Sequence, residues 1–246
     1  MNCPGALQRI RIVLAQAQHP GNIGAAARAM KTMGLSRLYL VNPREFPHPQ
    51  ATAMASGADD VLAAARLCAS LPEALSDTVL AAALTARPRE LAVPMRWARE
   101  AAAELVAAAG SGEVALVFGN ETSGLSNDEL ALCHLPVSIP ANPAYSSLNL
   151  AAAVQVLCYE LQLAAQAPGA APAIEFEAAH HEDVERLLAH FESAMVGSGF
   201  LDPARPRRLM PRLRRLFARA RLEREEVNIL RGMLAAFESA RQDNLE

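Results

Sequence analysis

The chain is poor in aromatic residues and in lysine, and these shortages limit what it can be. Aromatic residues make up 4% of its 246 residues and hydrophobic residues 52%, so the core is expected to be helix-rich and built largely from small aliphatic side chains. A hydrophobic content this high excludes a wholly disordered chain. Of the 23 basic residues only Lys31 is a lysine, and the formal net charge is −3. The net charge alone therefore gives no indication of a nucleic-acid partner.

Paired cysteines, long apolar runs and targeting signals are also missing. Cys3, Cys68, Cys133 and Cys158 are far apart and form no C-x-x-C pair, so we expect reduced thiols in a cytoplasmic protein. No apolar run approaches the roughly 18–20 residues of a membrane span. Residues 1–12 lack the pattern of a signal peptide. Histidines 180, 181 and 190 are not spaced to place metal ligands on one helical face, so we expect no metal site.

The first 165 residues alternate between strand-like and helix-like segments. Short apolar runs predict strands over residues 9–15, 37–41, 78–84, 113–118 and 137–139. Helices are predicted over residues 22–33, 51–66, 95–109 and 148–165, and Ser126 with Glu129 forms a capping box that opens another short helix. This alternation is typical of an α/β domain with a mostly parallel sheet and helices on both faces.

A segment rich in proline, glycine and alanine at residues 167–173 ends this pattern. Beyond residue 178 the sequence predicts only helices, at about 180–196, 206–220 and 223–241. We therefore predict an α/β domain over residues 1–166, a linker over 167–178 and a small helical extension over 179–246.

Three polar loops follow predicted strands, where ligands bind in open α/β sheets. The first, QAQHPGNIGAAARAM, carries Asn22 and Arg28; the second, GNETSGLS, carries Glu121; the third is PANPAYSSLNL. Each also has an ordinary structural explanation, since Asn22, Ser146 and Ser147 are suited to helix caps and the glycines to tight turns. The G-x-G-x-x-G, P-loop and G-x-S-x-G motifs are absent. The residues alone indicate a polar ligand at the sheet edge and do not identify a reaction.

The predicted extension contains a strongly basic segment. Between residues 205 and 224 there are nine arginines and one acid, a local charge of +8. Four of the arginines fall on one stripe of a helix: Arg208, Arg212, Arg215 and Arg219. A solvated amphipathic helix or, less well, a membrane-surface helix would share this pattern. The density and single sign of the charges favour binding to the phosphates of a nucleic acid.

Taken together, the three loops resemble the three motifs of the SPOUT superfamily of RNA ribose methyltransferases. The resembling segments are GNIGAAARAMKTMGL, LVFGNETSGLSNDEL and IPANPAYSSLNLAAAVQVLCYEL. The resemblance is closest to the tRNA (cytidine/uridine-2′-O-)-methyltransferases, and MPRLRRLFARARLEREEVNILRGML resembles their C-terminal extension. It implies a parallel sheet flanked by helices that contains a deep trefoil knot, a topology that no pattern rule would suggest.

The resemblance also implies a function, a methyl donor and site residues. The donor is S-adenosylmethionine, and the acceptor is the ribose 2′-hydroxyl of cytidine or uridine at nucleotide 32 of the tRNA anticodon loop, in a cytoplasmic homodimer. The donor-binding positions are Leu84, Thr85, Ala86, Gly119, Ile139, Ser146, Ser147 and Leu148. The reactive positions are Asn22, Arg28, Glu121, Ser147 and Asn149.

The chemistry requires in-line alignment of the hydroxyl and the methyl group, together with help in removing a proton. A guanidinium is protonated at neutral pH and is a poor general base, so our hypothesis is that Arg28 stabilises the forming alkoxide and holds the adjacent phosphate. Asn22 and Glu121 would orient it. Two alternatives stay open: a ribose methyltransferase of the same fold with another RNA target, and a non-catalytic RNA-binding module.

Overall fold

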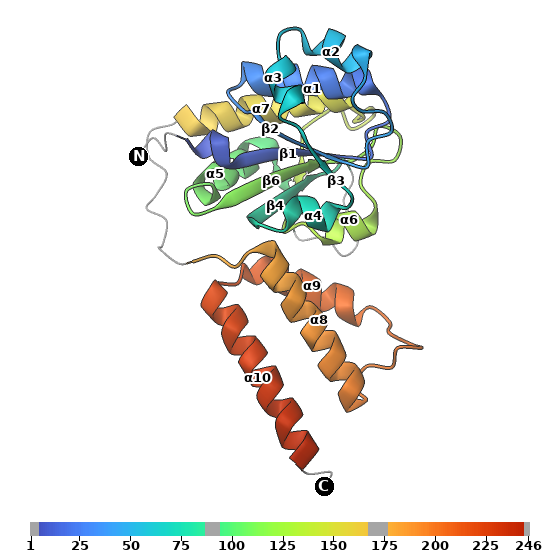
Figure 1. The fold of residues 1–246 in the computed structure, drawn as a ribbon, viewed down its shortest axis with the longest axis vertical. Coiled ribbons are helices and arrows are strands. Elements are labelled where there is room, and N and C mark those ends of the chain that lie inside the picture. Colours follow the sequence, from blue (N-terminus) through green and yellow to red (C-terminus); the bar gives the residue numbers. More distant parts are fainter. Residues whose placement is uncertain (1–4, 87–93, 167–176, 244–246) are drawn as a thin grey trace.

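The computed structural model describes residues 5–86, 94–166 and 177–243. Within these residues lies a seven-stranded sheet of order β3-β2-β1-β6-β4-β7-β5, in which all neighbouring strands are parallel (Figure 1). The strands are β1 (Ile10–Ala15), β2 (Arg37–Val41), β3 (Arg66–Cys68), β4 (Thr78–Leu84), β5 (Arg96–Trp97), β6 (Glu113–Phe118) and β7 (Leu135–Ser138). The predicted parallel α/β architecture is confirmed.

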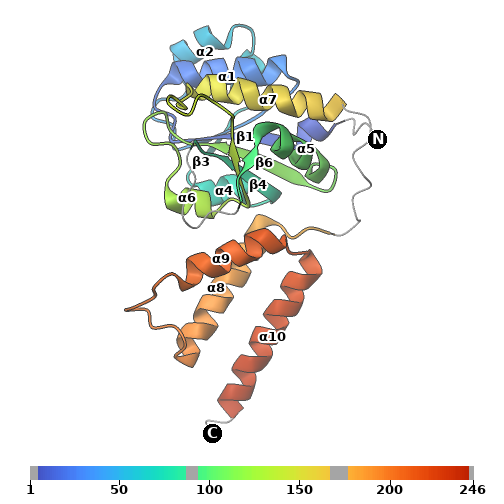
Figure 2. The same cartoon turned by 180° about the vertical axis from the view of Figure 1, so that it is seen from behind.

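Helices cover both faces of this sheet (Figures 1 and 2). One face is covered by the 3-10 helix η1 (Ala6–Arg9) and by α1 (Pro20–Thr32), α2 (Pro49–Ala55), α3 (Asp59–Ala63), α5 (Ala98–Ala108) and α7 (Leu150–Gln166). The other is covered by α4 (Leu71–Leu75) and α6 (Asn127–Ala131). Since β1 is buried along its whole length and β6 nearly so, their sequences are almost continuously apolar and do not alternate.

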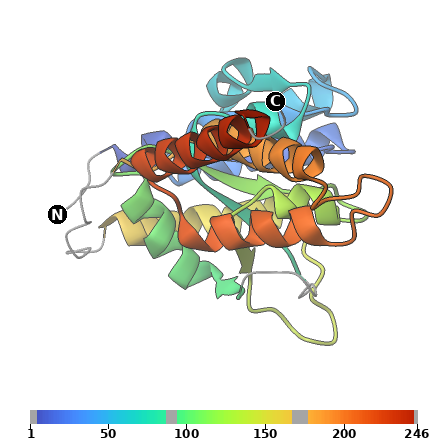
Figure 3. The ribbon, with the colours of Figure 1, turned by 90° about the horizontal axis from the view of Figure 1, so that it is seen from below.

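The C-terminal part of the chain forms α8 (His181–Ser198), α9 (Leu209–Ala220) and α10 (Arg224–Asp243), which lie on the α4 and α6 side of the sheet (Figure 3). They enclose a small core that includes Leu187, Val227 and Leu234. The helical extension predicted beyond residue 178 is confirmed. The predicted linker at 167–178 lies almost wholly outside the described residues.

The start of α8 attaches the extension to the α/β domain. The backbone N–H of Glu182 donates to the carbonyl of Ser76 at 3.1 Å, and the His180 ring contacts the carbonyl of Asp77 at 3.0 Å. The His134 and His181 rings meet edge to face, with their centroids 6.0 Å apart. Farther along, α9 lies beside α6, the helix that follows the GNETSG loop.

Some predicted boundaries are wrong for identifiable reasons. The single helix expected over residues 51–66 is two helices and a strand, because Ser56 and Gly57 both take left-handed backbone angles and end α2. Helix α9 begins at Leu209 rather than at Pro206, after Arg207 with a φ of 51°. The short strands β3 and β5 and the helix α4 were not anticipated. A capping signal at Ser70 and Glu73 marks the start of α4, since the Glu73 N–H donates to Ser70 Oγ.

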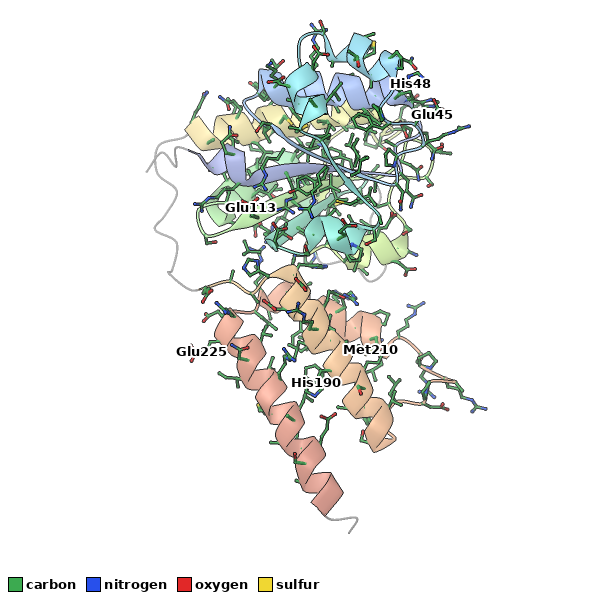
Figure 4. The ribbon with its side chains drawn as sticks, viewed as in Figure 1. Glu45, His48, Glu113, His190, Met210 and Glu225 are labelled. Carbon is green, nitrogen blue, oxygen red and sulfur yellow. The ribbon has the colours of Figure 1, made fainter. Side chains whose placement is uncertain are left out.

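The amino-terminal end of the sheet is held by one fully buried cation. Arg11 on β1 donates two hydrogen bonds to Asp77, at 2.6 and 2.8 Å, and one to Glu113, at 3.2 Å. Glu113, labelled in Figure 4, begins β6. The guanidinium also lies 4.5 Å from the centre of the Tyr39 ring. The hydrogen bonds from Arg11 lower the pKa of Asp77, so this carboxyl group stays charged opposite Arg11.

Close packing of α1 on α2 generates a stability prediction. A Cβ atom built on Gly24 would lie 2.0 Å from the carbonyl oxygen of Ala51, whereas one on Gly232 of α10 would meet no atom within 4 Å. We expect Gly24→Ala to lower the free energy of unfolding by roughly 2–4 kcal/mol, because the two helices must move apart. Gly232→Ala should raise it by up to about 1 kcal/mol. Urea unfolding monitored by circular dichroism measures both, and equal effects would contradict the described packing.

The His134–His181 contact generates a prediction of pH dependence. Burial lowers the pKa of His134 to about 3 and that of His181 to about 4. His181 and then Arg221 add to the lowering for His134, and Arg214 adds to it for His181. In the unfolded chain both rings titrate near pH 6.5, so the unfolded state binds more protons below that pH. The free energy of unfolding should therefore fall as the pH is lowered from about 6.5 to 4. His181→Gln should make this fall shallower, and an unchanged slope would contradict the prediction.

Candidate active site

The carboxylate of Glu121 connects the second polar loop to the first. It accepts the backbone N–H of Gln18 at 2.8 Å, the N–H of His19 at 3.2 Å and the side-chain amide of Asn22 at 2.9 Å. Partial burial alone would raise the pKa of Glu121, but these hydrogen bonds outweigh it and the pKa is lowered. Glu121 is thus ionised at neutral pH and holds the start of α1 in place.

Asn149 joins the third loop to the same network. Its amide Nδ2 donates to Oδ1 of Asn22 at 3.1 Å. Its own Oδ1 accepts the N–H groups of Ala151 at 2.9 Å and Ala152 at 3.3 Å, so Asn149 caps α7. Glu121, Asn22 and Asn149, predicted from three separate motifs, therefore form one hydrogen-bonded chain.

The second loop is a tight turn that glycine makes possible. The N–H of Gly124 donates to the carbonyl of Asn120 at 3.0 Å, and the Asn120 side chain accepts the N–H groups of Thr122 and Ser123. A Cβ on Gly119 would lie 2.2 Å from the carbonyl carbon of Gly124. The glycines of GNETSG are needed for the turn, which is the structural explanation that the sequence suggested for them. The turn places Glu121 beside α1.

The predicted donor-binding residues lie around three neighbouring strand ends. Strands β6, β4 and β7 are adjacent, and Leu84 of β4 pairs with Val137 of β7. The N–H of Thr85 continues this pairing to the carbonyl of Val137 at 2.8 Å. Gly119 and Ile139 directly follow β6 and β7, so these positions share one edge of the sheet.

The remaining donor-binding positions differ in exposure. Ser146 is half-buried, whereas Ala86, Ser147 and Leu148 are exposed. Leu148 leaves 43% of its surface open, an apolar side chain next to the polar chain that ends at Asn149. Leu84 and Ile139 are half-buried against the main core, and Leu148 is exposed. With the serine hydroxyls and the backbone of Gly119, they are group types that suit a ligand with an aromatic base and a polar chain.

Arg28 is not part of this network. It lies six residues beyond Asn22 on α1, about 9 Å along the helix axis and on a different face. Its side chain is exposed, and it makes no hydrogen bond or ion pair with the other residues that the structure describes. Within one chain, therefore, Arg28 faces outward from the helix that carries Asn22.

The predicted basic stripe is partly exposed and partly used in packing. Arg208, just before α9, and Arg212 and Arg219 on it are exposed, while Arg215 is half-buried. Three other arginines of this segment have structural partners, since Arg214 pairs with Glu185 of α8, Arg221 with Glu104 of α5 and Arg224 with Glu177. The stripe thus combines an outward basic surface with the attachment of the extension.

The cysteines, possible metal ligands and long helices of the described residues bear on other kinds of site. Cys68, Cys133 and Cys158 are buried free thiols, and burial raises the pKa of Cys133 and Cys158 to about 12, far from that of a reactive nucleophile. No group of three or more His, Cys, Asp or Glu residues is arranged to hold a metal ion within the described ranges. Of the helices described there, none is long and apolar enough to cross a membrane.

Sequence reasoning missed the groups in this site that have no side-chain signature. The N–H groups of Gln18 and His19 bind Glu121, but any residue at these positions would supply them. The sequence offered one indication of these donors, the carboxylate of Glu121 between two glycines. An acid in a tight turn needs hydrogen-bond donors from elsewhere in the fold.

Comparison with known proteins relates most of the chain to RNA methyltransferases. Residues 9–159 match the SpoU rRNA methylase family, and residues 182–246 match the C-terminal domain of the tRNA methyltransferase TrmJ. The tRNA (cytidine/uridine-2′-O-)-methyltransferase TrmJ of Klebsiella pneumoniae is 51% identical over 237 residues, covering 94% of this chain and 97% of the relative.

Solved structures agree with this relationship. The crystal structure of TrmJ from Z. mobilis is 35% identical, covers 93% of this chain and 98% of its own, and has a TM-score of 0.83. A structure concerned with 2-OH methylation of C/U34 on tRNA is 27% identical, with a TM-score of 0.51 over 63% of this chain and 95% of its own. The chain therefore belongs to the SpoU family of RNA methyltransferases and carries a C-terminal domain of the TrmJ type.

Proposed function

We propose that the protein is a tRNA methyltransferase that transfers a methyl group from S-adenosylmethionine to the ribose 2′-hydroxyl of cytidine or uridine at nucleotide 32 of the anticodon loop. The observation that carries this proposal is the hydrogen-bonded chain of Glu121, Asn22 and Asn149 at the carboxyl edge of the sheet. It joins all three motifs of a family of RNA methyltransferases, next to the strand ends predicted to bind the donor.

The residues at those strand ends fit the methyl donor. Leu84, Ile139 and Leu148 would enclose its adenine, while backbone groups near Thr85 and Gly119 would form hydrogen bonds with it. Ser146 and Ser147 would bind its polar parts. When bound, S-adenosylmethionine supplies an activated methyl group on a positively charged sulfur.

The protein's own groups then align the acceptor and stabilise charge. Arg28 would donate hydrogen bonds to the developing alkoxide and to a neighbouring phosphate. The hydrogen bond to the alkoxide would strengthen as the hydroxyl gives its proton to solvent water and its oxygen takes the methyl group from the sulfur, which leaves as neutral S-adenosylhomocysteine. Ser147 and Asn149 would orient the ribose. Glu121 keeps the first and second loops together but, being bound by three N–H donors, it is not placed to act as a base.

The outward direction of Arg28 favours a homodimer in which each subunit supplies this residue to the other's site. Several large apolar side chains are exposed on and near α7, which supports an interface there: Trp97, Tyr145, Leu148, Tyr159 and Leu163. We further propose the trefoil knot of the SPOUT fold, a cytoplasmic location and no protein partner other than the second subunit. The exposed arginines Arg208, Arg212 and Arg219, with Arg215 beside them, would bind tRNA phosphates.

Methyl transfer to defined tRNA tests the proposal. Wild-type protein and labelled S-adenosylmethionine are incubated with tRNA carrying a 2′-deoxynucleotide at position 32 or at position 34. We expect transfer to unmodified tRNA and to the 34-deoxy form, and none to the 32-deoxy form. Loss of transfer only with the 34-deoxy form would assign the target to nucleotide 34. A protein that binds no S-adenosylmethionine in a titration would be a non-catalytic RNA-binding module.

Substitution of Arg28 tests its assigned role. We expect Arg28→Ala to lower kcat by about 100- to 1000-fold, the range seen when one donor to a developing oxyanion is removed. Binding of S-adenosylmethionine, measured by calorimetry, should change little. Arg28→Lys should restore only a small part of the rate, because a single ammonium cannot contact two oxygens in the same geometry. Near-full turnover by the lysine variant, or loss of donor binding in the alanine variant, would contradict the role.

Asn149 offers a substitution that separates its two contacts. Serine retains the cap of α7 but removes the amide that donates to Asn22, so Asn149→Ser should leave unfolding nearly unchanged and lower kcat about 10-fold. The matched control is Asn142→Ser in the same loop, where Asn142 only accepts the N–H of Ala144 among its described side-chain contacts. Equal loss of rate in the two variants would show that the link to Asn22 has no specific role.

A further inference from the structure

The loop between α8 and α9 presents an aromatic side chain to solvent. Phe200 has 72% of its surface exposed, and among the large apolar side chains that the structure describes only Tyr145 is more exposed. A single exposed apolar side chain is common on protein surfaces, so Phe200 gains significance only from the residues around it. Phe200 has no place in the site described above.

The residues beside Phe200 are fixed to the extension. Gly199 ends α8 in the left-handed conformation, with a φ of 78°. Leu201 is 5% exposed, and its N–H donates to the carbonyl of Met195 at 3.0 Å. Both neighbours of Phe200 are held in place, so the backbone at Phe200 is anchored. Its ring points to solvent although Leu201 beside it is buried.

The chain after Phe200 forms a turn and then carries two exposed arginines. The side-chain carboxylate of Asp202 accepts the N–H of Ala204 at 2.8 Å, and the backbone carbonyl of Asp202 accepts the N–H of Arg205 at 3.0 Å. Arg205 and Arg207 follow within the next few residues and are exposed. Asp202 is the one acid between residues 197 and 222, so the surroundings of Phe200 are strongly positive.

This loop lies on the side of the molecule that carries the candidate active site. In Figures 1 and 3 it extends toward the same side as the loops at the carboxyl ends of the strands. Its side chains project away from α8 and α9 and from the side of the extension formed by α10 (Figure 4). Helix α9, which begins after the loop, contacts α6, the helix that follows the Glu121 turn.

We propose that Phe200 is a stacking platform for an unpaired base of the RNA substrate, with Arg205 and Arg207 holding the phosphates on either side of that base. An aromatic face flanked by cations is the combination by which proteins bind single-stranded nucleic acid. The inference rests on the proposed function, because it takes the partner to be tRNA, and it extends the binding surface beyond the basic stripe of α9.

A second copy of the chain is a poorer occupant of this surface. Two symmetric copies meeting at Phe200 would bring Arg205 and Arg207 of each close to those of the other, and like charges at an interface core are unfavourable. A polyanion neutralises the same arginines. The observations therefore favour RNA over self-association.

Binding of full-length protein to two RNA probes tests the platform. The probes are a 17-nucleotide anticodon stem-loop and a blunt RNA duplex of similar charge, with affinities measured by fluorescence anisotropy at fixed salt. Phe200→Leu should weaken stem-loop binding about 5- to 50-fold, while Phe200→Tyr should retain it. Duplex binding should change less than twofold in both. Phe237→Leu is the matched control, because Phe237 is 65% exposed on α10 and has no described role in the site.

Three outcomes would overturn the proposal. Unchanged stem-loop affinity in Phe200→Leu would show that the ring does not stack on RNA, and an equal loss for the duplex would show a general effect on charge or folding. A drop in mass by sedimentation would assign the residue to subunit association. Should wild-type protein transfer no methyl group to tRNA, the proposed function would be wrong, while the comparison of the two probes would still decide whether Phe200 stacks on unpaired RNA.

Discussion

One ionised carboxylate holds the site together. Glu121 accepts three N–H donors from the loop that begins α1, and through Asn22 it is linked to the residue that caps α7. Glu121 lies about a hundred residues from the loop that it binds, and Asn149 lies 127 residues from Asn22, so these contacts join parts of the chain that are distant in sequence. Without that carboxylate, the N–H of the half-buried Gln18 would lose its acceptor at the sheet edge, at a cost of about 1–3 kcal/mol.

The rest of the fold makes this contact possible. Parallel strands β1, β6, β4 and β7 bring their carboxyl ends to one edge, while Arg11 with Asp77 and Glu113 fixes the opposite edge. Gly119 allows the turn that carries Glu121, and Gly24 allows α1 to lie close against α2. The extension attaches on the α4 and α6 side of the sheet, so a basic surface and the site can face the same substrate.

Sequence patterns were informative where burial dictates composition. The strands β1, β4 and β6 are apolar because both of their faces are covered, and each was predicted within a residue of its observed bounds. The motifs with Asn22, Glu121 and Asn149 were predicted to act together and do lie in hydrogen-bonding contact. The two-residue strand β5 and the backbone donors to Glu121 could not be predicted, because neither requires a particular side chain. The exposure of Phe200 was also hidden, since a sequence does not show which apolar residues a small helical domain leaves uncovered.

The central claim is that this edge of the sheet positions a ribose hydroxyl for methylation. Mass spectrometry of nuclease fragments from tRNA treated with the protein and S-adenosylmethionine tests it most directly. The account predicts a single added methyl group on the ribose of cytidine or uridine in the fragment that contains nucleotide 32. A methyl group on a base would contradict it.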